Sequence, residues 1–453
     1  MKSNFVPAHS VELSDNEIKK IVKDNNVKVI KLQFTDLNGQ VKNLSVQVSQ
    51  IDKLLNNEMI LDGSSIKGFR SIETADMYLY PDKKTFTLLP WLSKETGNAA
   101  RLICDIYNAD ATPFEGCPRA NLKRVIAEAK EWGFEMQVGP EAEFFLFKKD
   151  ENGMATTITN DFAGYYDAGP DDKGEEIRTK IVDGLETMGF EIETSHHEVA
   201  RGQHEIGFKH ADALTTADNL ATFKMAVKAI ADKNGLHATF MPKPLVGING
   251  SGMHCNISLY NKGKNAFFDE DKPNHLSDIT FHAIGGILKH IRAVTAIANP
   301  TVNSYKRLVP GYEAPVYLAW SLENRSALVR VLAKKDEETR IELRSPDPSC
   351  NPYLAFAAIL TAVMDGIKKK LTPPEAVDSN IYKLSFKERK RYKINSLPSS
   401  LNEALDIMER STIVRLALGE HIYNEFISAK RREWDSFSTY VSGWELDRYL
   451  ARY

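Results

Sequence analysis

Cysteine is scarce in this chain of 453 residues. The only four are Cys104, Cys117, Cys255 and Cys350, and no two of them share the CxxC spacing of zinc knuckles and redox sites. Their number and spacing exclude a dense disulfide framework and indicate reduced thiols, as in cytosolic proteins. We therefore expect a cytoplasmic location.

Long apolar runs and an excess of one charge are also lacking. The most apolar run, Tyr353 to Met364, is too short to span a bilayer and predicts a buried helix. The first residues contain no apolar segment of signal-peptide length. The formal net charge is −3, without any run of five like charges. We therefore expect neither a membrane protein nor a dedicated nucleic-acid binder.

Several common motifs for phosphate and zinc are missing as well. Asn249-Gly250-Ser251-Gly252 brings two glycines close to a predicted strand but lacks the Walker lysine and the GxGxxG pattern. The histidines and glutamates between His196 and Glu205 do not have HExxH spacing. A P-loop, a Rossmann turn and a zinc protease are therefore not indicated.

What is present is a soluble, globular composition, 42% hydrophobic and 26% charged, with length for more than one domain. Ser14 to Glu17 forms a capping box for a short helix, and Asn38-Gly39 joins two alternating segments in a predicted hairpin. A Pro- and Gly-rich connector, 111–118, follows this small α/β unit. Beyond it, helices interleave with strands, including one over Met136–Phe147. We predict an α+β fold whose larger part is a mainly antiparallel sheet backed by helices.

Three stretches place chemically active side chains on alternate residues, with mostly apolar residues between them. In a strand, such residues share one face. Glutamates occupy that face in the first stretch, His with Asn and Ser in the second, and Arg-Glu-Arg in the third. The stretches are Glu141-Ala142-Glu143-Phe144, Met253-His254-Cys255-Asn256-Ile257-Ser258 and Arg340-Ile341-Glu342-Leu343-Arg344. If these faces converge, they form a site for divalent metal and a polyanion.

Each pattern also has a plainer interpretation. Glu141 and Glu143 could lie on a solvated edge strand, although like carboxylates on one face favour a cation between them. His254 could be a buried structural histidine. The cluster His196-His197-Glu198 with His204-Glu205 suits Mg²⁺ or Mn²⁺ but could equally be a surface group. The arginines, which present a rigid fork to phosphate or carboxylate, could form a salt-bridge row with Glu342.

Taken together, the segments resemble type I glutamine synthetase. Motifs in the family's order are LDGSSIKGF, VGPEAEFFLF, SHHEVARGQHEI, KPLVGINGSGMHCNISL, NPTVNSYKRLVPGYEAP, NRSALVRV and RIELRSPDPSCNPYLAF. They span Leu61 to Phe356, and the likeness extends from about Ser14 over nearly the whole chain. The ending from Trp444-Glu445 to Tyr453 is similar to the shorter, feedback-regulated branch.

The resemblance implies a β-grasp-like domain over 14–110 and a catalytic domain with a curved antiparallel sheet over 111–453. It implies a homo-oligomer, a dodecamer of two hexameric rings with active sites between subunits. The implied reaction joins ammonia to the γ-carboxylate of L-glutamate through γ-glutamyl phosphate, with ATP as substrate and Mg²⁺ or Mn²⁺ as cofactor. Binding of nitrogen-response transcription regulators is a further expectation from this branch.

The resemblance also implies roles for individual residues. The expected ligands of the metal near the glutamate carboxylate are Glu143, Glu198 and Glu205, and those of the metal on the ATP phosphates are Glu141, His254 and Glu342. The positions that match glutamate-holding residues are Asn249, Gly250, Arg307 and Arg344. The positions that match ATP-binding residues are Ser258, Arg325, Arg330 and Arg340.

Two loop residues complete the implied site. Asp62 matches the aspartate that an adjacent subunit supplies to bind ammonium and accept its proton, because ammonium is not a nucleophile until it is deprotonated. Glu313 matches the flap residue that closes over the acyl phosphate and excludes water. With Arg325 and Arg344, these two residues form the expected catalytic set.

Three positions depart from the family pattern. Arg201 stands where relatives often have Pro, the loop Ala333–Glu338 is acidic where relatives are basic or small, and Ser71 aligns with a regulatory arginine, with Arg70 one place earlier. Adenine contacts and glutamine feedback are therefore not implied by these segments. Two other functions remain open from the sequence: a γ-glutamyl ligase for another amine or polyamine, and a catalytically silent scaffold or regulator.

Overall fold

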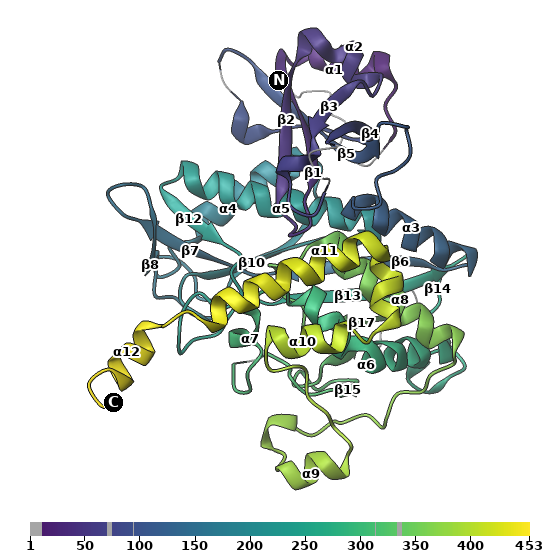
Figure 1. Ribbon diagram of the computed structural model, residues 1–453, viewed down its shortest axis with the longest axis vertical. Helices are drawn as coiled ribbons and strands as arrows, with labels where there is room; N and C mark the ends of the chain where they lie inside the picture. The colour runs from purple at the N-terminus through teal and green to yellow at the C-terminus, as the bar shows by residue number, and fades with distance from the viewer. Residues whose placement is uncertain (1–10, 70–74, 94, 313, 333–337) are drawn as a thin grey trace.

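The computed structural model describes residues 11–69, 75–93, 95–312, 314–332 and 338–453. A small N-terminal domain sits on a larger helix-and-sheet body, and the C-terminal helix α12 (Gly443–Tyr449) projects away from that body (Figure 1). In the described part of the chain, no helix is both long enough and apolar enough to cross a membrane.

The N-terminal domain contains a five-stranded sheet with strand order β2-β1-β5-β4-β3. β1 and β5 are parallel, whereas the other neighbours are antiparallel. The strands are β1 (Val27–Thr35), β2 (Val41–Gln47), β3 (Met59–Asp62), β4 (Asp76–Leu88) and β5 (Asn98–Asn108), with helices α1 (Asp15–Asp24) and α2 (Ile51–Leu55). The side chains that these elements bury form a core of their own.

Both local predictions for this domain are confirmed. Ser14 and Glu17 form the capping box of α1, and β1 pairs with β2 across the Asn38-Gly39 turn. Gly39 has φ of +79°, and a Cβ there would lie 2.8 Å from the Cα of Asn351 in the larger domain. The Asn351 side chain donates to the carbonyl of Asp36 at 3.0 Å. The hairpin turn therefore docks the small domain onto the large one.

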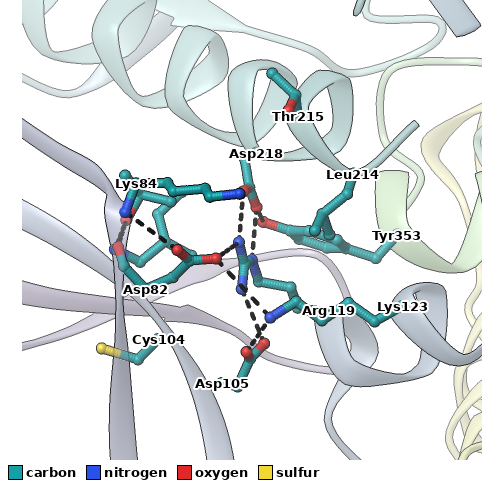
Figure 2. Close-up of polar contacts among 12 residues, drawn as sticks. Asp82, Lys84, Cys104, Asp105, Arg119, Lys123, Leu214, Thr215, Asp218 and Tyr353 are labelled. Atoms are coloured by element: carbon teal, nitrogen blue, oxygen red, sulfur yellow. Dashed lines mark hydrogen bonds and ion pairs between the residues drawn. The ribbon is translucent and has the colours of Figure 1, made fainter. Parts of the chain in front are cut away.

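Arg119 is the second link between the domains. It lies at the start of α3 (Pro118–Glu131), where its guanidinium is surrounded by the carboxylates of Asp82, Asp105 and Asp218 (Figure 2). Asp82 and Asp105 belong to β4 and β5, whereas Asp218 belongs to α5 (Ala213–Lys233) of the larger domain. The exact boundary predicted at 110/111 stays a prediction.

The larger domain has two hydrogen-bonded sheets, which together carry the predicted active strands. One sheet has the order β12-β7-β10-β9 with β8 beside β7, and the other has the order β11-β6-β13-β17-β16-β15 with β14 beside β13. The first sheet comprises β7 (Phe144–Lys149), β8 (Ala155–Thr159), β9 (Ile192–His197), β10 (Gln203–Phe208) and β12 (Leu236–Thr239). The second comprises β6 (Glu135–Ala142), β11 (Ala211–Asp212), β13 (Met253–Asn261), β14 (Lys264–Asn265), β15 (Trp320–Ser321), β16 (Val329–Leu332) and β17 (Arg340–Leu343).

The predicted single strand over Met136–Phe147 is in fact two strands. β6 ends at Ala142 and β7 begins at Phe144, and each belongs to a different sheet. The break falls on Glu143, which lies between the two strands and whose backbone N–H donates to the carbonyl of Gly252, one step beyond the β6–β13 pairing of Ala142 with Met253. Glu141 and Glu143 are thereby directed to different groups of side chains.

Helices pack around these sheets and supply most of the large core. The predicted buried helix is confirmed as α8 (Pro352–Lys368), whose residues from Tyr353 to Met364 are almost all buried. The remaining helices are α4 (Glu175–Thr187), α6 (Asp278–Ala298), α7 (Ser304–Arg307), α9 (Phe386–Arg391), α10 (Leu401–Met408) and α11 (Thr412–Ser438). The predicted α+β class, with a mainly antiparallel sheet backed by helices, is therefore confirmed.

Candidate active site

Strand register assembles the first group of site residues. Glu141 on β6 is directly opposite His254 on β13, and Glu342 on β17 is opposite Asn256 on β13. His254 and Asn256 are two residues apart on the same strand, so all four side chains share one face of the sheet. Alternating polar residues of three separate strands therefore converge on this face.

The first group has the composition of a metal site. Ligand atoms of Glu141, His254 and Glu342 all lie within 4.8 Å of one another. The His254 Nδ1 is 3.5 Å from a carboxylate oxygen of each glutamate. Burial would raise the pKa of Glu141, but its hydrogen bond with His254 and neighbouring positive charge lower it below the usual value. The carboxylate is therefore held in its ionised, metal-binding form.

Arginines flank this group on the neighbouring strands. Arg344 donates to Glu342 at 2.7 Å, and Arg330 on β16 donates to the other oxygen of the same carboxylate at 3.4 Å. Among the described residues, the Nε atoms of Arg330 and Arg344 are buried without a hydrogen-bond partner. Each arginine therefore retains a donor that a phosphate or carboxylate oxygen can accept.

Asn256 connects the metal group to a further arginine. Its amide donates to Glu141 at 2.9 Å, and its carbonyl oxygen accepts from Arg340 Nε at 3.2 Å. Ser258, two residues further along β13, lies on the same face of the strand and is buried. The structure thus brings the predicted nucleotide-side residues Arg330, Arg340 and Ser258 to one region of the sheet.

A second group gathers at the β9–β10 hairpin. His196 on β9 pairs with Glu205 on β10, and Glu198 follows the end of β9. Ligand atoms of His196, Glu198 and Glu205 lie within 4.8 Å of one another. Burial would lower the pKa of His196, but its hydrogen bond with Glu205 and the charge of Glu198 raise it. The predicted metal ligands Glu198 and Glu205 therefore lie close together, with His196 between them.

Glu143 stands beside this second group. It is only 8% exposed, and burial together with the charges of Glu198 and Glu205 raises the pKa of its carboxyl well above the usual range. Three converging carboxylates repel one another, and a bound cation would offset that repulsion. Carboxylate oxygens with one imidazole suit Mg²⁺ or Mn²⁺, so the residues present fit the expected ion.

The predicted glutamate-holding loop approaches Glu143 from β13. Gly252 donates its N–H to Glu143 at 2.9 Å, and a Cβ on Gly252 would lie 2.6 Å from Arg307 Nη2. Arg307 is buried and donates to the carbonyls of Ser345 and Pro346 at 2.7 and 3.2 Å. The close approach of Glu143, Gly252 and Arg307 thus requires the glycine.

Two tyrosines that sequence reasoning missed line the second group. The rings of Tyr165 and Tyr166 lie 5.8 and 4.8 Å from the His196 ring. The hydrogen bond with Tyr166, burial and the charge of Glu198 raise the pKa of Tyr165, while the charge of Arg325 opposes that rise. Arg325, predicted to bind phosphate, is therefore near this group, although it comes from a different part of the chain. Neither tyrosine follows an alternating strand pattern.

A third group of possible ligands has a structural explanation. Asp161, His197 and His204 are all buried, and their ligand atoms also lie within 4.8 Å of one another. The Asp161 carboxylate is 3.1 Å from His197 Nε2 and accepts the N–H of Gly202 at 2.9 Å. Arg178 Nη1 lies 3.0 Å from His204 Nδ1. These contacts pair the Asp161 carboxylate, His197 Nε2 and His204 Nδ1 within the protein, and they brace the β9–β10 hairpin.

Other predicted residues do not join these groups. Asp62, at the end of β3, is exposed in the N-terminal domain, and Figure 1 places β3 well apart from β13 and β17. Glu313, Arg70 and Ser71 lie outside the described residues, as does most of the predicted acidic loop. Arg201 is exposed, with its guanidinium 5.9 Å from the ring centre of Phe162.

Comparisons with known proteins agree over nearly the whole chain. The family model for the glutamine synthetase β-grasp domain matches residues 26–109, and the model for the catalytic domain matches residues 115–449. Glutamine synthetase of Clostridium saccharobutylicum is 55% identical over 437 residues, covering 96% of this chain and 98% of the relative. That of Staphylococcus aureus strain MW2 is 55% identical over 439 residues, covering 97% and 98%.

Solved structures agree as well. The structure of a GmaS/ADP complex has a TM-score of 0.87 and 32% identity, covering 96% of this chain and 99% of that one. Plasmodium falciparum glutamine synthetase has a TM-score of 0.86 and 30% identity, covering 98% and 100%. The sequence, the fold and the arrangement of the site therefore lead to one conclusion: this chain belongs to the type I glutamine synthetase family.

Proposed function

We propose that Glu141, His254 and Glu342 hold the divalent ion on the ATP phosphates, and that Glu143, Glu198 and Glu205 hold the ion near the glutamate carboxylate. The activity itself follows from the family: the chain is an ATP-dependent ligase that forms L-glutamine from L-glutamate and ammonia, with ADP and phosphate as products. One observation carries the assignment: Glu141, His254 and Glu342 form one group of ligand atoms, and Glu198 and Glu205 form another with His196, beside which Glu143 lies. We propose Mg²⁺ as the ion, with Mn²⁺ as a substitute.

The arginines complete the phosphate side in this proposal. Bound divalent ions supply charge neutralisation and orientation for the transferring phosphoryl group. Arg330 and Arg344 are already held by Glu342, so their buried Nε donors are directed before substrate arrives. Arg340, held by Asn256, and Ser258 lie next to them for ATP. Arg325 would meet the transferring phosphate from the side of Tyr165.

Glutamate would lie between the two groups. We assign its binding to Asn249, Gly250, Arg307 and Arg344. Gly252 lets the backbone pass close to Glu143 and Arg307, and Gly250 lets it pass close to the carbonyl of Pro242, so the polar atoms around the substrate are already in place. Glu313 would close over the reactive acyl phosphate and exclude water.

Ammonium would be bound by Asp62 of an adjacent subunit. Within one chain Asp62 belongs to the N-terminal domain, apart from both ligand groups (Figure 1). A second chain that contributes its β3–loop segment would complete the site. We therefore propose a homo-oligomer with sites between subunits, arranged as a dodecamer of two hexameric rings. Mass measurement of the intact assembly tests this: a stable, fully active monomer would contradict it.

The amine specificity is tested by measuring ATP-dependent phosphate release with glutamate. We expect release with ammonium and little with a panel of alkylamines and polyamines. Release only with amines would assign the chain to the other γ-glutamyl ligases. No release with any amine, from protein that binds ATP, would favour a silent scaffold.

Three further proposals rest on the resemblance. They are a cytoplasmic location, the domain division 14–110 and 111–453, and binding of nitrogen-response transcription regulators. Fractionation of cells tests the first, and limited proteolysis at the connector tests the second. Pull-down of a purified regulator of this kind by the glutamine-bound enzyme tests the third, and absence of binding at micromolar concentrations would contradict it.

A further inference from the structure

Gln203 is a buried amide at the centre of the glutamate side. It is the first residue of β10, two positions before Glu205, and the residue is 1% exposed. Burying an amide is costly unless its donors and acceptor are paired. Its partners therefore indicate what this side chain does.

Two of its side-chain partners, Glu143 and Gly250, belong to the proposed site. The Nε2 atom donates to Glu143 Oε2 at 2.7 Å and to the carbonyl of Gly250 at 3.1 Å. The Oε1 atom accepts the N–H of Ala200 at 3.2 Å. A carboxylate and a carbonyl can only accept, and the Ala200 N–H can only donate. These partners therefore fix the positions of Oε1 and Nε2 in the Gln203 amide.

The backbone of Gln203 also forms a hydrogen bond with Glu198, another proposed metal ligand. The carbonyl of Gln203 accepts the N–H of Glu198 at 2.8 Å. Ala200 lies in the turn between Glu198 and Glu205, so the side-chain contact also fixes that turn. One residue therefore connects the segments that carry Glu143, Glu198, Glu205 and the Gly250 loop.

The contacts also orient the Glu143 carboxylate. In the described part of the chain, both hydrogen bonds to this carboxylate, from Gln203 and from Gly252, end on Oε2. The other oxygen, Oε1, is thus the one presented to an ion. Outer hydrogen bonds of this kind orient metal ligands and tune their affinity.

We propose that Gln203 is a positioning residue of the glutamate side: its amide holds the Glu143 carboxylate and the Gly250 carbonyl in one arrangement, so that metal binding and glutamate binding are coupled. This inference rests on the proposed roles of Glu143 and Gly250. It does not involve the ATP side, where Asn256 makes the corresponding contact with Glu141.

The test compares Gln203→Leu, which removes every side-chain hydrogen bond, with Gln203→Glu, which keeps the shape but not the donors. Mn²⁺ binding to the intact assembly without substrates, followed by electron paramagnetic resonance, should show one of the two sites weakened about 10- to 100-fold in both variants. The KM for glutamate should rise by a similar factor, whereas the KM for ATP should change less than about threefold.

Gln33→Leu is the matched control, because Gln33 is also a buried glutamine but lies in the N-terminal domain. It should leave both Mn²⁺ sites unchanged. Equal loss at both Mn²⁺ sites, or equal rises in both KM values, would show a merely structural role and overturn the inference.

Glu143→Gln separates failure of this inference from failure of the proposed function. If it removes one Mn²⁺ site while Gln203→Leu leaves both intact, only the role of Gln203 is wrong. If it changes neither Mn²⁺ site, the metal assignment on which the inference rests is wrong.

Discussion

Glu141 and Glu143 are two residues apart but serve different groups of side chains. Glu141 Oε2 lies 3.5 Å from His254 Nδ1, whereas Glu143 Oε2 accepts from Gln203 at 2.7 Å. The strand break between Ala142 and Phe144 leaves Glu141 in β6 of one sheet and places Glu143 at the junction with β7 of the other sheet. This short segment therefore joins the proposed ATP side to the proposed glutamate side.

Neutralising Glu141 and Glu143 one at a time should affect the KM values for ATP and for glutamate differently. Glu141→Gln should raise the KM for ATP at least about 10-fold with a smaller change for glutamate, because it removes a carboxylate from the phosphate-side ligands. Glu143→Gln should do the reverse. Steady-state kinetics at saturating Mg²⁺ measures both constants. Identical effects of the two variants on both substrates would contradict the division.

Removing divalent metal should destabilise the folded protein, more so at higher pH. The raised pKa of Glu143 means that its contribution to stability is fully present below 4.5 and is lost as pH rises toward its folded pKa. Metal at 100 times its Kd should restore about 2.7 kcal/mol for a single site. Thermal unfolding with and without a chelator measures this.

The matched variant for that experiment is Glu143→Gln. It lacks the carboxylate, so its metal-free form should depend less on pH above 4.5 than the metal-free wild type. Stability of the metal-free wild type that increases with pH over the same range would contradict the cause assigned here.

Asp62→Ala should lower kcat/KM for ammonium by about 10²- to 10⁴-fold, the usual contribution of a positioned proton acceptor. ATP binding should be nearly unchanged, because the residues proposed to bind ATP lie in the larger domain. Isothermal titration with a non-hydrolysable ATP analogue measures the second quantity. Asp52→Ala, an exposed aspartate of the same domain, is the control. Lost nucleotide binding in Asp62→Ala would show that the assignment is wrong.

Ser64→Ala should shift the acidic limb of the ammonium-dependent activity to higher pH. Hydrogen bonds from the Ser64 hydroxyl and N–H, at 2.6 and 2.8 Å, lower the pKa of Asp62, so the carboxylate stays ionised at lower pH. Loss of the hydroxyl should raise that pKa toward its ordinary value of 3.8.

Ser65→Ala is the control for this pH effect, because its hydroxyl is 3.4 Å from the same carboxylate and contributes less. The pH profile of kcat/KM for ammonium measures both variants. A shift toward lower pH in Ser64→Ala, or a larger shift in Ser65→Ala, would contradict the cause.

Alternation correctly predicted which residues of the first group share a face of the sheet. His254, Asn256 and Glu342 share a face because a strand repeats every two residues, and register then aligns the neighbouring strands. The same reasoning misplaced Glu143, since it continued one strand through a break that no Gly or Pro at 142–144 signals. Gln203 had a usable signal, its i, i+2 relation to Glu205, but alternation does not show which contacts a buried amide makes.

The alternation of polar and apolar residues could not predict the site residues that lie at or in loops. Asp62 ends β3 and caps an ordinary polar turn, and only the family resemblance assigned it a role. Tyr165 and Tyr166 reach His196 through a loop whose path depends on tertiary contacts. Periodicity carries no information about such positions.

Arg119→Met should destabilise the protein by about 3–5 kcal/mol, because it leaves buried carboxylates without their cation. Arg119 donates to Asp82, Asp105 and Asp218 at 2.7–3.0 Å (Figure 2). Lys130→Met on the same helix removes only an exposed pair with Glu135 and should cost at most about 1 kcal/mol. Urea unfolding of both variants measures the difference.

The effect of Arg119→Met should depend on pH in one direction. Burial would raise the pKa of Asp82, but Arg119 and Lys123 lower it below 3.8, so the ion pair stabilises the wild type above that pH and is lost as pH falls through the lowered pKa. Without Arg119 the carboxylates take up protons at higher pH, which relieves their mutual repulsion. The stability difference between wild type and variant should therefore be largest near neutrality and should shrink toward acid. A difference that grows on acidification would mean that Arg119 stabilises the domain junction through packing of its side chain, not through its charge.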